Sequence, residues 1–365
     1  DAKHREARRA GGEVGPAPEA DHRPLVAVAG RIRQLRDTGK LIFQDVLDET
    51  GKLQLFIGKK QVGDDWAAAA LTDLGDFVWA AGRLGLTKAG ELTIFVERYQ
   101  ILTKAILPPP NIAEKTSGQS VADAEMRQRR RYLDLMMNQT TRRRFQVRSQ
   151  IVAAIRRRLD ETGFVEVETP MMQPLFGGAK ARPFITFHNT LDMRLYLRIA
   201  PELYLKRLLV GGLEKVYEIN RNFRNEGAST QHNPEFTMLE LYEAYADYNR
   251  MMDVTEEIVE AGLAAAGLGS SIHYQGQTLE FQRPWPRLRY IDLFEEHVGF
   301  SWGDRSKMEQ RVAERALDPK LLQLPDDWLA VELWEDAVEP HLTQPCFIVD
   351  FPTAISPLAK QRADD

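Results

Sequence analysis

The stretch Phe223–Phe236, reading FRNEGASTQHNPEF, decides how the rest of this chain is interpreted. Around a bend rich in glycine, serine and threonine it gathers four chemically distinct side chains: Arg224, Glu226, His232 and Phe236. A guanidinium offers a planar fork of donors to a phosphate or a carboxylate. A carboxylate accepts from an exocyclic amine, and an aromatic ring stacks on a base. A surface hairpin tip would explain any one of these residues, but the four together predict a purine nucleotide site.

Segments on both sides of this stretch extend the pattern. They are GFVEVETP (163–170), GGAKARPF (177–184), LDMRLYLRIAPELYL (191–205), VYEINRN (216–222) and TMLELYEAYADY (237–248). With 163–170 as the end of motif 1 and 223–236 as motif 2, the chain resembles the class II lysyl-tRNA synthetases of bacterial type, from about Arg23 to its end. The aspartyl and asparaginyl relatives do not carry RNEG…HNPEF followed by this tail.

Composition sets the class of protein. The 365 residues are enough for two or three domains, and 43% hydrophobic with 28% charged residues is an ordinary balance for a globular chain. There is no run of about 18 apolar residues and no secretory leader pattern at the start, so no membrane association is expected. The single Cys346 excludes an intramolecular disulfide framework and fits a reducing compartment, so a cytoplasmic location is expected.

The net charge of −5, from 48 basic and 53 acidic side chains, is not that of a general nucleic-acid binder. A chain of this charge that binds RNA must concentrate its positive charge locally. Three arginine-rich runs do so, at 127–131, 142–144 and 156–158. Contact with a phosphate backbone and solvated helix faces both remain open as interpretations.

Alternating patterns predict a first domain of β structure. Strands are expected at Leu25–Gly30, Leu41–Val46, Leu53–Ile57, Phe77–Arg83 and Leu92–Tyr99, with a helix within 64–73. Five strands with one inserted helix are typical of an OB-fold barrel, a fold used for oligonucleotides. We therefore predict a flexible lead-in at 1–23, an OB-fold domain at 24–107, a linker at 108–126 and a catalytic domain at 127–365. The expected class is α+β.

The catalytic domain is expected to open with a long helix. Ile151, Ile155 and Leu159 repeat every four residues within Phe145–Glu161, and Gly163 ends the pattern. A strand is expected at 164–168. The resemblance implies an antiparallel sheet with flanking helices, and a homodimer through the Phe145–Pro170 region.

The resemblance assigns site residues by position. For the anticodon of tRNA(Lys) they are Arg36, Phe43, Gln54 and Glu91. For ATP they are Arg224 on the α-phosphate, Glu226 on the adenine amine, His232 on the triphosphate and Phe236 against the adenine ring. For L-lysine they are Gly178, Glu202, Arg224, Glu240 and Tyr242. Arg224 is the expected catalytic residue.

The resemblance also sets expectations for cofactors and completeness. ATP with Mg²⁺ is expected, and the metal ligands and motif 3 of the family would lie beyond residue 365. We expect the natural protein to continue and the 365-residue chain alone to be inactive. The leading function is a lysine–tRNA ligase. The alternatives are a catalytically incomplete tRNA-binding paralogue, or a paralogue that lysylates another acceptor, which the barrel disfavours.

Overall fold

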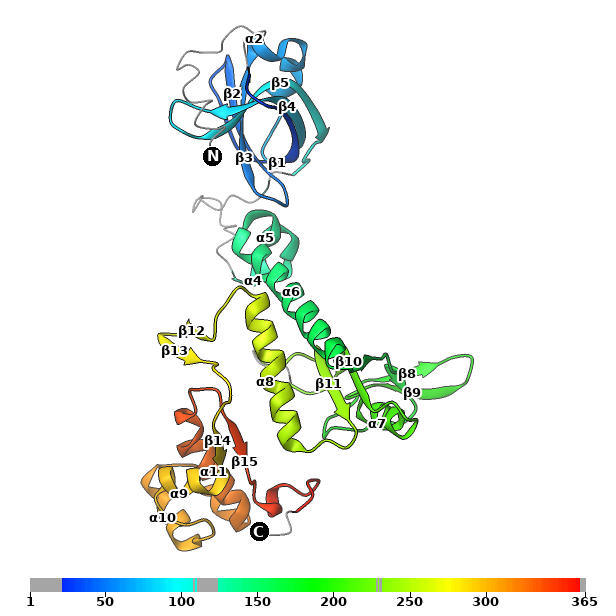
Figure 1. The fold of residues 1–365 in the computed structure, drawn as a ribbon, viewed down its shortest axis with the longest axis vertical. Coiled ribbons are helices and arrows are strands. Elements are labelled where there is room, and N and C mark those ends of the chain that lie inside the picture. Colours follow the sequence, from blue (N-terminus) through cyan, green and yellow to red (C-terminus); the bar gives the residue numbers. More distant parts are fainter. Residues whose placement is uncertain (1–21, 108, 110–123, 228, 230–231, 362–365) are drawn as a thin grey trace. The chain divides into compact units, whose positions relative to one another are not determined.

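The computed structural model describes residues 22–107, 109, 124–227, 229 and 232–361 (Figure 1). The lead-in at 1–21 and most of the predicted linker therefore lie outside the described residues. The chain divides into two compact units, Asp1–Arg142 and Arg143–Asp365. Since this division falls inside a helix, the domain boundaries drawn from the sequence stay predictions.

The first unit contains a closed five-stranded barrel in the order β1-β2-β3-β5-β4. Its strands are β1 (Leu25–Asp37), β2 (Leu41–Leu47), β3 (Lys52–Gly58), β4 (Phe77–Leu86) and β5 (Leu92–Thr103). The pairs are antiparallel except β3 with β5. The predicted barrel is confirmed. Gly82 permits the closest strand approach, since a Cβ there would lie 2.1 Å from the Phe95 carbonyl oxygen.

Alternation along the strands separates an apolar interior from an outward face. Ile42, Leu55 and Ile94 are among the fully buried residues of the core. Gln44 is buried with them, because its side chain accepts from the Tyr99 hydroxyl at 2.7 Å. The helix expected within 64–73 is the short α3 (Trp66–Ala70), which is preceded by α2 (Lys59–Val62) and the 3₁₀ turn η2 (Gly63–Asp65).

Two short helices follow, α4 (Ala124–Arg129) and α5 (Arg131–Met137). The buried carboxylate of Asp134 accepts from Arg127 Nε at 3.1 Å and from Arg131 Nη1 at 2.8 Å. Two arginines of the first basic run are thus engaged inside the protein, which favours a structural role for them.

Helix α6 (Gln139–Glu161) starts before the predicted Phe145. Asn138 explains the earlier start, since its side-chain oxygen accepts from the Thr140 backbone N–H at 3.0 Å and thereby caps the helix. The following strand is shorter than predicted. Only β6 (Val165–Glu166) pairs, in parallel with β10.

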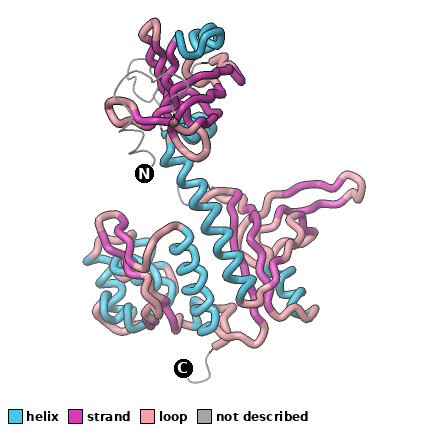
Figure 2. Tube along the Cα trace, turned by 45° about the horizontal axis from the view of Figure 1, so that its top comes forward, coloured by secondary structure: helices cyan, strands magenta, loops and turns pink. Residues whose placement is uncertain are grey.

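The second unit is built on small sheets with helices beside them. One sheet has the order β11-β10-β6 and another β7-β9-β8. Their remaining strands are β7 (Met172–Gln173), β8 (Ile185–His188), β9 (Met193–Leu197), β10 (Lys215–Phe223) and β11 (Glu235–Glu243), with helices α7 (Glu202–Val210) and α8 (Tyr248–Ala265). Strands β8 and β9 form a hairpin that extends away from β10 and β11 (Figure 2).

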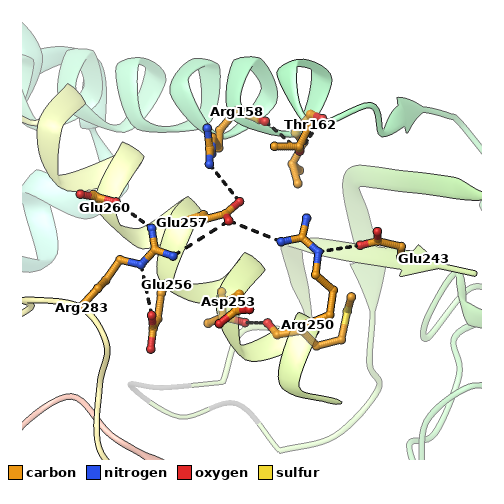
Figure 3. Close-up of polar contacts among 12 residues, drawn as sticks. Arg158, Thr162, Glu243, Arg250, Asp253, Glu256, Glu257, Glu260 and Arg283 are labelled. Carbon is orange, nitrogen blue, oxygen red and sulfur yellow. Dashed lines mark hydrogen bonds and ion pairs between the residues drawn. The ribbon is translucent and has the colours of Figure 1, made fainter. Parts of the chain in front are cut away.

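Helices α6 and α8 cover one face of the β10–β11 pair. Tyr217, Leu159 and Val254 are buried together there, and Leu239 packs against them. An ion-pair network joins the same elements (Figure 3). Glu257 of α8 lies 3.1 Å from Arg158 of α6 and 3.4 Å from Arg250. Because these contacts occupy one face of the pair, the opposite face is the one left to bind a ligand.

The remaining elements form a two-stranded sheet at 271–280 and, from residue 287 onward, a separate apolar cluster. They are β12 (Ser271–Tyr274), β13 (Gln277–Glu280), β14 (Arg287–Arg289), α9 (Tyr290–Val298), α10 (Arg305–Glu314), η3 (Pro319–Gln323), α11 (Asp326–Ala337), η4 (Glu339–His341), β15 (Phe347–Val349) and η5 (Thr353–Ile355). Phe294, Met308 and Leu329 are buried at its centre. No helix among the described residues is long and apolar enough to span a membrane.

Candidate functional site

The face of β10 and β11 opposite the helices carries three of the predicted ligand-binding residues, Phe236, Glu240 and Tyr242, and Arg224 follows directly after β10. In the antiparallel register Glu218 lies opposite Glu240, Asn222 opposite Phe236 and Val216 opposite Tyr242. Directly opposed residues of an antiparallel pair point to the same side of a sheet. One surface therefore carries carboxylates toward one end and an aromatic ring toward the other.

An acidic cluster forms at the first end. The Tyr242 hydroxyl donates to Glu240 Oε2 at 3.2 Å. Burial raises the pKa of Glu240, and the nearby carboxylates of Glu202 and Glu218 raise it further. Burial together with the charges of Glu240 and Glu202 also raises the pKa of Tyr242. Such a group of partly desolvated acids is stabilised by a cation.

Gly178 lies directly against this cluster. Its φ of +86° is one that L side chains rarely adopt, and a Cβ there would lie 2.7 Å from Glu202 Cβ and 3.2 Å from Ala200 Cβ. Only glycine fits, so backbone rather than side chain faces Glu202. The Glu202 carboxylate itself lies 2.5 Å from Lys206 Nζ on the same helix.

A buried ion pair lies next to the acids. Arg198 Nη1 and Glu218 Oε1 are 2.7 Å apart, and both side chains are 1% exposed. Glu218 Oε2 accepts from the Thr169 hydroxyl at 2.6 Å, and Arg198 Nε donates to the Arg221 carbonyl at 2.9 Å. These bonds join the segment after β6 to the ligand-facing strand. The positive charge of Arg198 also lowers the pKa of Glu240, against the larger effect of burial.

Arg224 and Phe236 meet at the other end of the face. The Arg224 Cζ lies 5.2 Å from the centroid of the Phe236 ring. The Arg224 Nε is buried with no hydrogen-bond partner among the described residues. The Asn225 backbone N–H donates to the Arg182 carbonyl at 2.8 Å, which joins the start of the loop to the GGAKARPF segment.

Glu226 and His232 lie on the exposed loop between β10 and β11. The His232 Nδ1 is 2.9 Å from the Ser229 hydroxyl. Among the described residues, no hydrogen bond or ion pair joins either side chain to Arg224. The structure thus brings Arg224 and Phe236 together and leaves Glu226 and His232 outside that contact.

The outward face of the barrel carries a row of neighbouring aromatic rings in edge-on and tilted contact. The Arg36 Cζ lies 4.6 Å from the centroid of Phe43, whose ring centroid is 5.2 Å from that of Phe56. Phe56 in turn lies 5.3 Å from Phe95, and the Arg23 Cζ is 4.3 Å from the Phe95 centroid. None of the three rings belongs to the barrel core cluster. Flat rings between cationic side chains suit unpaired bases.

Polar groups border this row. Gln54 Oε1 accepts from the Thr93 hydroxyl at 2.9 Å, and Gln54 lies opposite Asp45 on β2. Lys52 Nζ lies 3.0 Å from Asp45 and 3.9 Å from Glu91. Arg36, Phe43, Gln54 and Glu91 therefore occupy one region of the barrel, on or beside its outward face.

Comparisons with known proteins agree with this two-part geometry. The family described as tRNA synthetases class II (D, K and N) matches residues 123–365, and the OB-fold nucleic acid binding domain matches residues 26–102. The lysine–tRNA ligase of Pelotomaculum thermopropionicum is 48% identical over 358 residues, covering 95% of this chain and 68% of that protein. The lysine–tRNA ligase of Carboxydothermus hydrogenoformans is 47% identical, with coverage of 93% and 69%. That of Magnetococcus marinus is 45% identical, with coverage of 98% and 71%.

The chain belongs to the lysine–tRNA ligase family. It is a class II aminoacyl-tRNA synthetase with an N-terminal OB-fold domain. One matched region corresponds to the barrel and the other contains the β10–β11 sheet, and these are the two places where the structure gathers candidate binding residues.

Several residues at the two candidate sites of this lysine–tRNA ligase family member were not predicted from the sequence. Phe56 and Phe95 were missed, although alternation along β3 from the predicted Gln54 places Phe56 on the same face. Arg198 and Glu218 were also missed. Their signal was present, since Glu218 lies within the apolar segment VYEI of β10 and Arg198 directly follows β9 before Ile199 and Ala200, and a buried charge is costly unless it is paired. Asn222 gave no such signal.

Proposed function

We propose that this chain is a lysine–tRNA ligase, which activates lysine with ATP to lysyl-adenylate and transfers the lysyl group to the 3′ end of tRNA(Lys). One observation carries the proposal. The same sheet face holds an acidic cluster at one end and an arginine stacked on an aromatic ring at the other. A cationic amino acid and an anionic nucleotide each find a complementary region there.

The acidic cluster is assigned to lysine. Glu202 and Glu240 would pair with the two ammonium groups, and the Tyr242 hydroxyl would lie beside the side chain. A cation in this position lowers the free energy of the ionised carboxylates that burial has raised. Gly178 leaves room for the substrate backbone, because any Cβ would collide with Glu202.

Arg224 and Phe236 are assigned to the nucleotide. In activation a lysine carboxylate oxygen bonds to the α-phosphorus, and the bond from that phosphorus to the pyrophosphate oxygen breaks. Both reactants are anionic, so catalysis depends on alignment and charge stabilisation. The Arg224 fork would hold the α-phosphate and the carboxylate together, and Phe236 would stack on the adenine. Glu226 and His232 are assigned to the adenine amine and the triphosphate.

Magnesium is expected with ATP, since it shields the triphosphate charge. Among the described residues there is no group of three or more His, Cys, Asp or Glu side chains placed to hold a metal ion. We therefore assign no protein ligands to Mg²⁺ and no step to it.

The barrel is assigned to the anticodon of tRNA(Lys). Phe43 would stack on one base, while Arg36, Gln54 and Glu91 would contact base edges. Stacking on protein rings contributes to binding for every base, and polar side chains at the border supply the preference for sequence.

We also propose a homodimer through the Phe145–Pro170 region, in the cytoplasm. Phe145 is 50% exposed and Val165 is 48% exposed, so both side chains offer apolar surface that a partner could cover. C2 symmetry would place these surfaces against their own copies. Analytical ultracentrifugation of the protein with Val165→Asp tests this, because a charge in the interface should produce monomers.

Lysine-dependent ATP–pyrophosphate exchange tests the function, with aspartate and arginine as controls, followed by charging of tRNA(Lys). Exchange with lysine and charging of tRNA support the ligase. Anticodon stem-loop binding without exchange would identify a tRNA-binding paralogue. Exchange without tRNA charging would identify a paralogue that lysylates another acceptor.

A further inference from the structure

Asn222 stands out among the polar residues of the ligand-facing strand. It is 1% exposed, and neither its side-chain oxygen nor its nitrogen has a hydrogen-bond partner among the described residues. Buried polar groups are almost always paired, and an unpaired one destabilises the fold. Its neighbour Asn220, on the same face, does have a partner, since its Nδ2 donates to Glu218 Oε1 at 3.2 Å. The orphaned amide of Asn222 therefore calls for a functional explanation.

A second orphaned group lies close to it. Arg224 Nε is buried and equally unpartnered. Strand pairing continues past the end of β10, because the Arg224 backbone N–H donates to the Pro234 carbonyl at 2.9 Å. Residues two apart in a strand point to the same face and are separated by about 7 Å along it. Asn222 and Arg224 are thus neighbours on one face.

Phe236 connects the two groups. It is the cross-strand partner of Asn222, and its ring lies 5.2 Å from the Arg224 Cζ. The amide and the guanidinium therefore flank the same ring. One offers an acceptor, Oδ1, and the other an N–H donor, Nε, so the two orphaned groups are complementary.

We propose that Asn222 is a positioning residue for Arg224. When nucleotide and amino acid bind, Asn222 Oδ1 accepts the Nε–H of Arg224. This bond orients the guanidinium so that its two terminal nitrogens point at the α-phosphate and the carboxylate, the groups that a fork of donors binds best. The inference rests on the proposed function, because it supposes that Arg224 contacts both reactants.

The test uses the absence of any hydrogen bond between the Asn222 side chain and the described residues. Asn222→Leu keeps the shape and removes the amide. It should leave the unfolding midpoint unchanged or raise it, while kcat for lysine-dependent pyrophosphate exchange falls roughly tenfold to a hundredfold, as for a lost hydrogen bond to a charged group. The KM for lysine should change little. Asn222→Asp, which keeps the acceptor, should be more active than Asn222→Leu.

Asn220→Leu is the matched control, since it makes the same change on the same face but removes a bond to Glu218. It should lower the unfolding midpoint. An unchanged kcat in Asn222→Leu would overturn the inference, and so would an Asn222→Asp variant no more active than Asn222→Leu. Neither result would touch the proposed function, which depends on the wild-type exchange with lysine.

A double-mutant cycle tests whether Asn222 acts through Arg224. Arg224→Lys keeps the charge but has no Nε–H, so Asn222→Leu should have no further effect in that background. Affinity for lysyl-sulfamoyl adenosine, a non-hydrolysable analogue of the adenylate, measures the cycle without requiring turnover. Coupling between the two substitutions supports the inference, even if Asn222→Leu also loses stability. Additive losses would overturn it.

Discussion

The outward face of the barrel and the ligand-facing side of β10 and β11 differ in how far their binding side chains are already paired within the protein. On the barrel, Arg36 already stacks on Phe43, and Gln54 already bonds to Thr93. On the catalytic sheet, Glu240 has a raised pKa, and Asn222 and Arg224 Nε have no partner among the described residues. The barrel face is complete before a ligand arrives, whereas the catalytic face is completed by one.

This difference follows from what each face must do. A platform for unpaired bases gains from rigid rings whose geometry is already set. A catalytic face gains from charges that are stabilised mainly when the reactants are bound, because only such differential interactions accelerate a reaction. The barrel face therefore presents binding groups whose contacts are already formed. The sheet face instead holds carboxylates and polar groups whose interactions are unfavourable until a ligand binds.

The largest expected effect concerns the ion pair beside the acidic cluster. Glu218→Gln leaves Arg198 buried without a counter-charge, so the free energy of unfolding should fall by about 3–5 kcal/mol. Urea unfolding measures this. Glu235→Gln on β11 is the control, because its pair with Arg221 is about half exposed and 3.6 Å long, and should contribute under about 1 kcal/mol. Equal losses in both variants would contradict the comparison.

The next effect concerns the chemistry itself. Arg224→Ala should lower kcat for pyrophosphate exchange by about 10²–10³-fold or more, the range for a lost charge-stabilising donor. The fold should persist, because the side chain makes few internal bonds. Arg221→Ala, one strand position from Asn222 and on the helix-covered side, is the control. Retention of near wild-type exchange by Arg224→Ala would remove this residue from the mechanism.

A smaller effect is expected on the barrel. Phe43→Ala should weaken binding of the tRNA(Lys) anticodon stem-loop by about 1–3 kcal/mol, the contribution of one stacked base, and leave pyrophosphate exchange unchanged. Phe77→Ala is a matched control, since Arg31 stacks on Phe77 at 4.1 Å in the β1–β4 pair. If both variants bind the stem-loop equally weakly, the outward row of rings is not the binding face.

The smallest effect is a pH dependence. Because the pKa of Glu240 is raised, the folded state holds its proton more tightly than the unfolded chain does, and stability is lost as the pH rises through the raised pKa. Glu240→Gln should remove this loss, so in urea unfolding the variant should gain stability relative to wild type above the raised pKa and not below the pKa of the unfolded chain.

The affinity for lysine should change with pH in the opposite direction to the stability. Its ammonium requires the ionised carboxylate, so the KM for lysine should fall as the pH rises through the same pKa. The Tyr242 hydroxyl bond lowers that pKa, so Tyr242→Phe should move the acidic limb of the profile to higher pH. A KM profile that Tyr242→Phe leaves in place would separate Glu240 from lysine recognition.

Sequence patterns within short segments were sufficient to predict a large part of the fold of this protein. Alternation predicted the five barrel strands, and the four-residue repeat of Ile151, Ile155 and Leu159 predicted α6. The resemblance carried by RNEG…HNPEF predicted the class II domain, and with it Arg224 and Phe236 as neighbours. These features depend on short segments whose periodicity or side-chain chemistry is visible in the order of residues alone.

Tertiary structure decided which side chains share a face and which remain unpaired. The register of β10 and β11 sets Glu218 against Glu240 and Asn222 against Phe236, and the fold buries Arg198 beside them. No local signal specifies such pairings, because strand register and burial depend on the packing of α6 and α8 behind the sheet. The sequence by itself determined the family and the elements. The electrostatics of the site arise only when distant segments exclude water from the same charges.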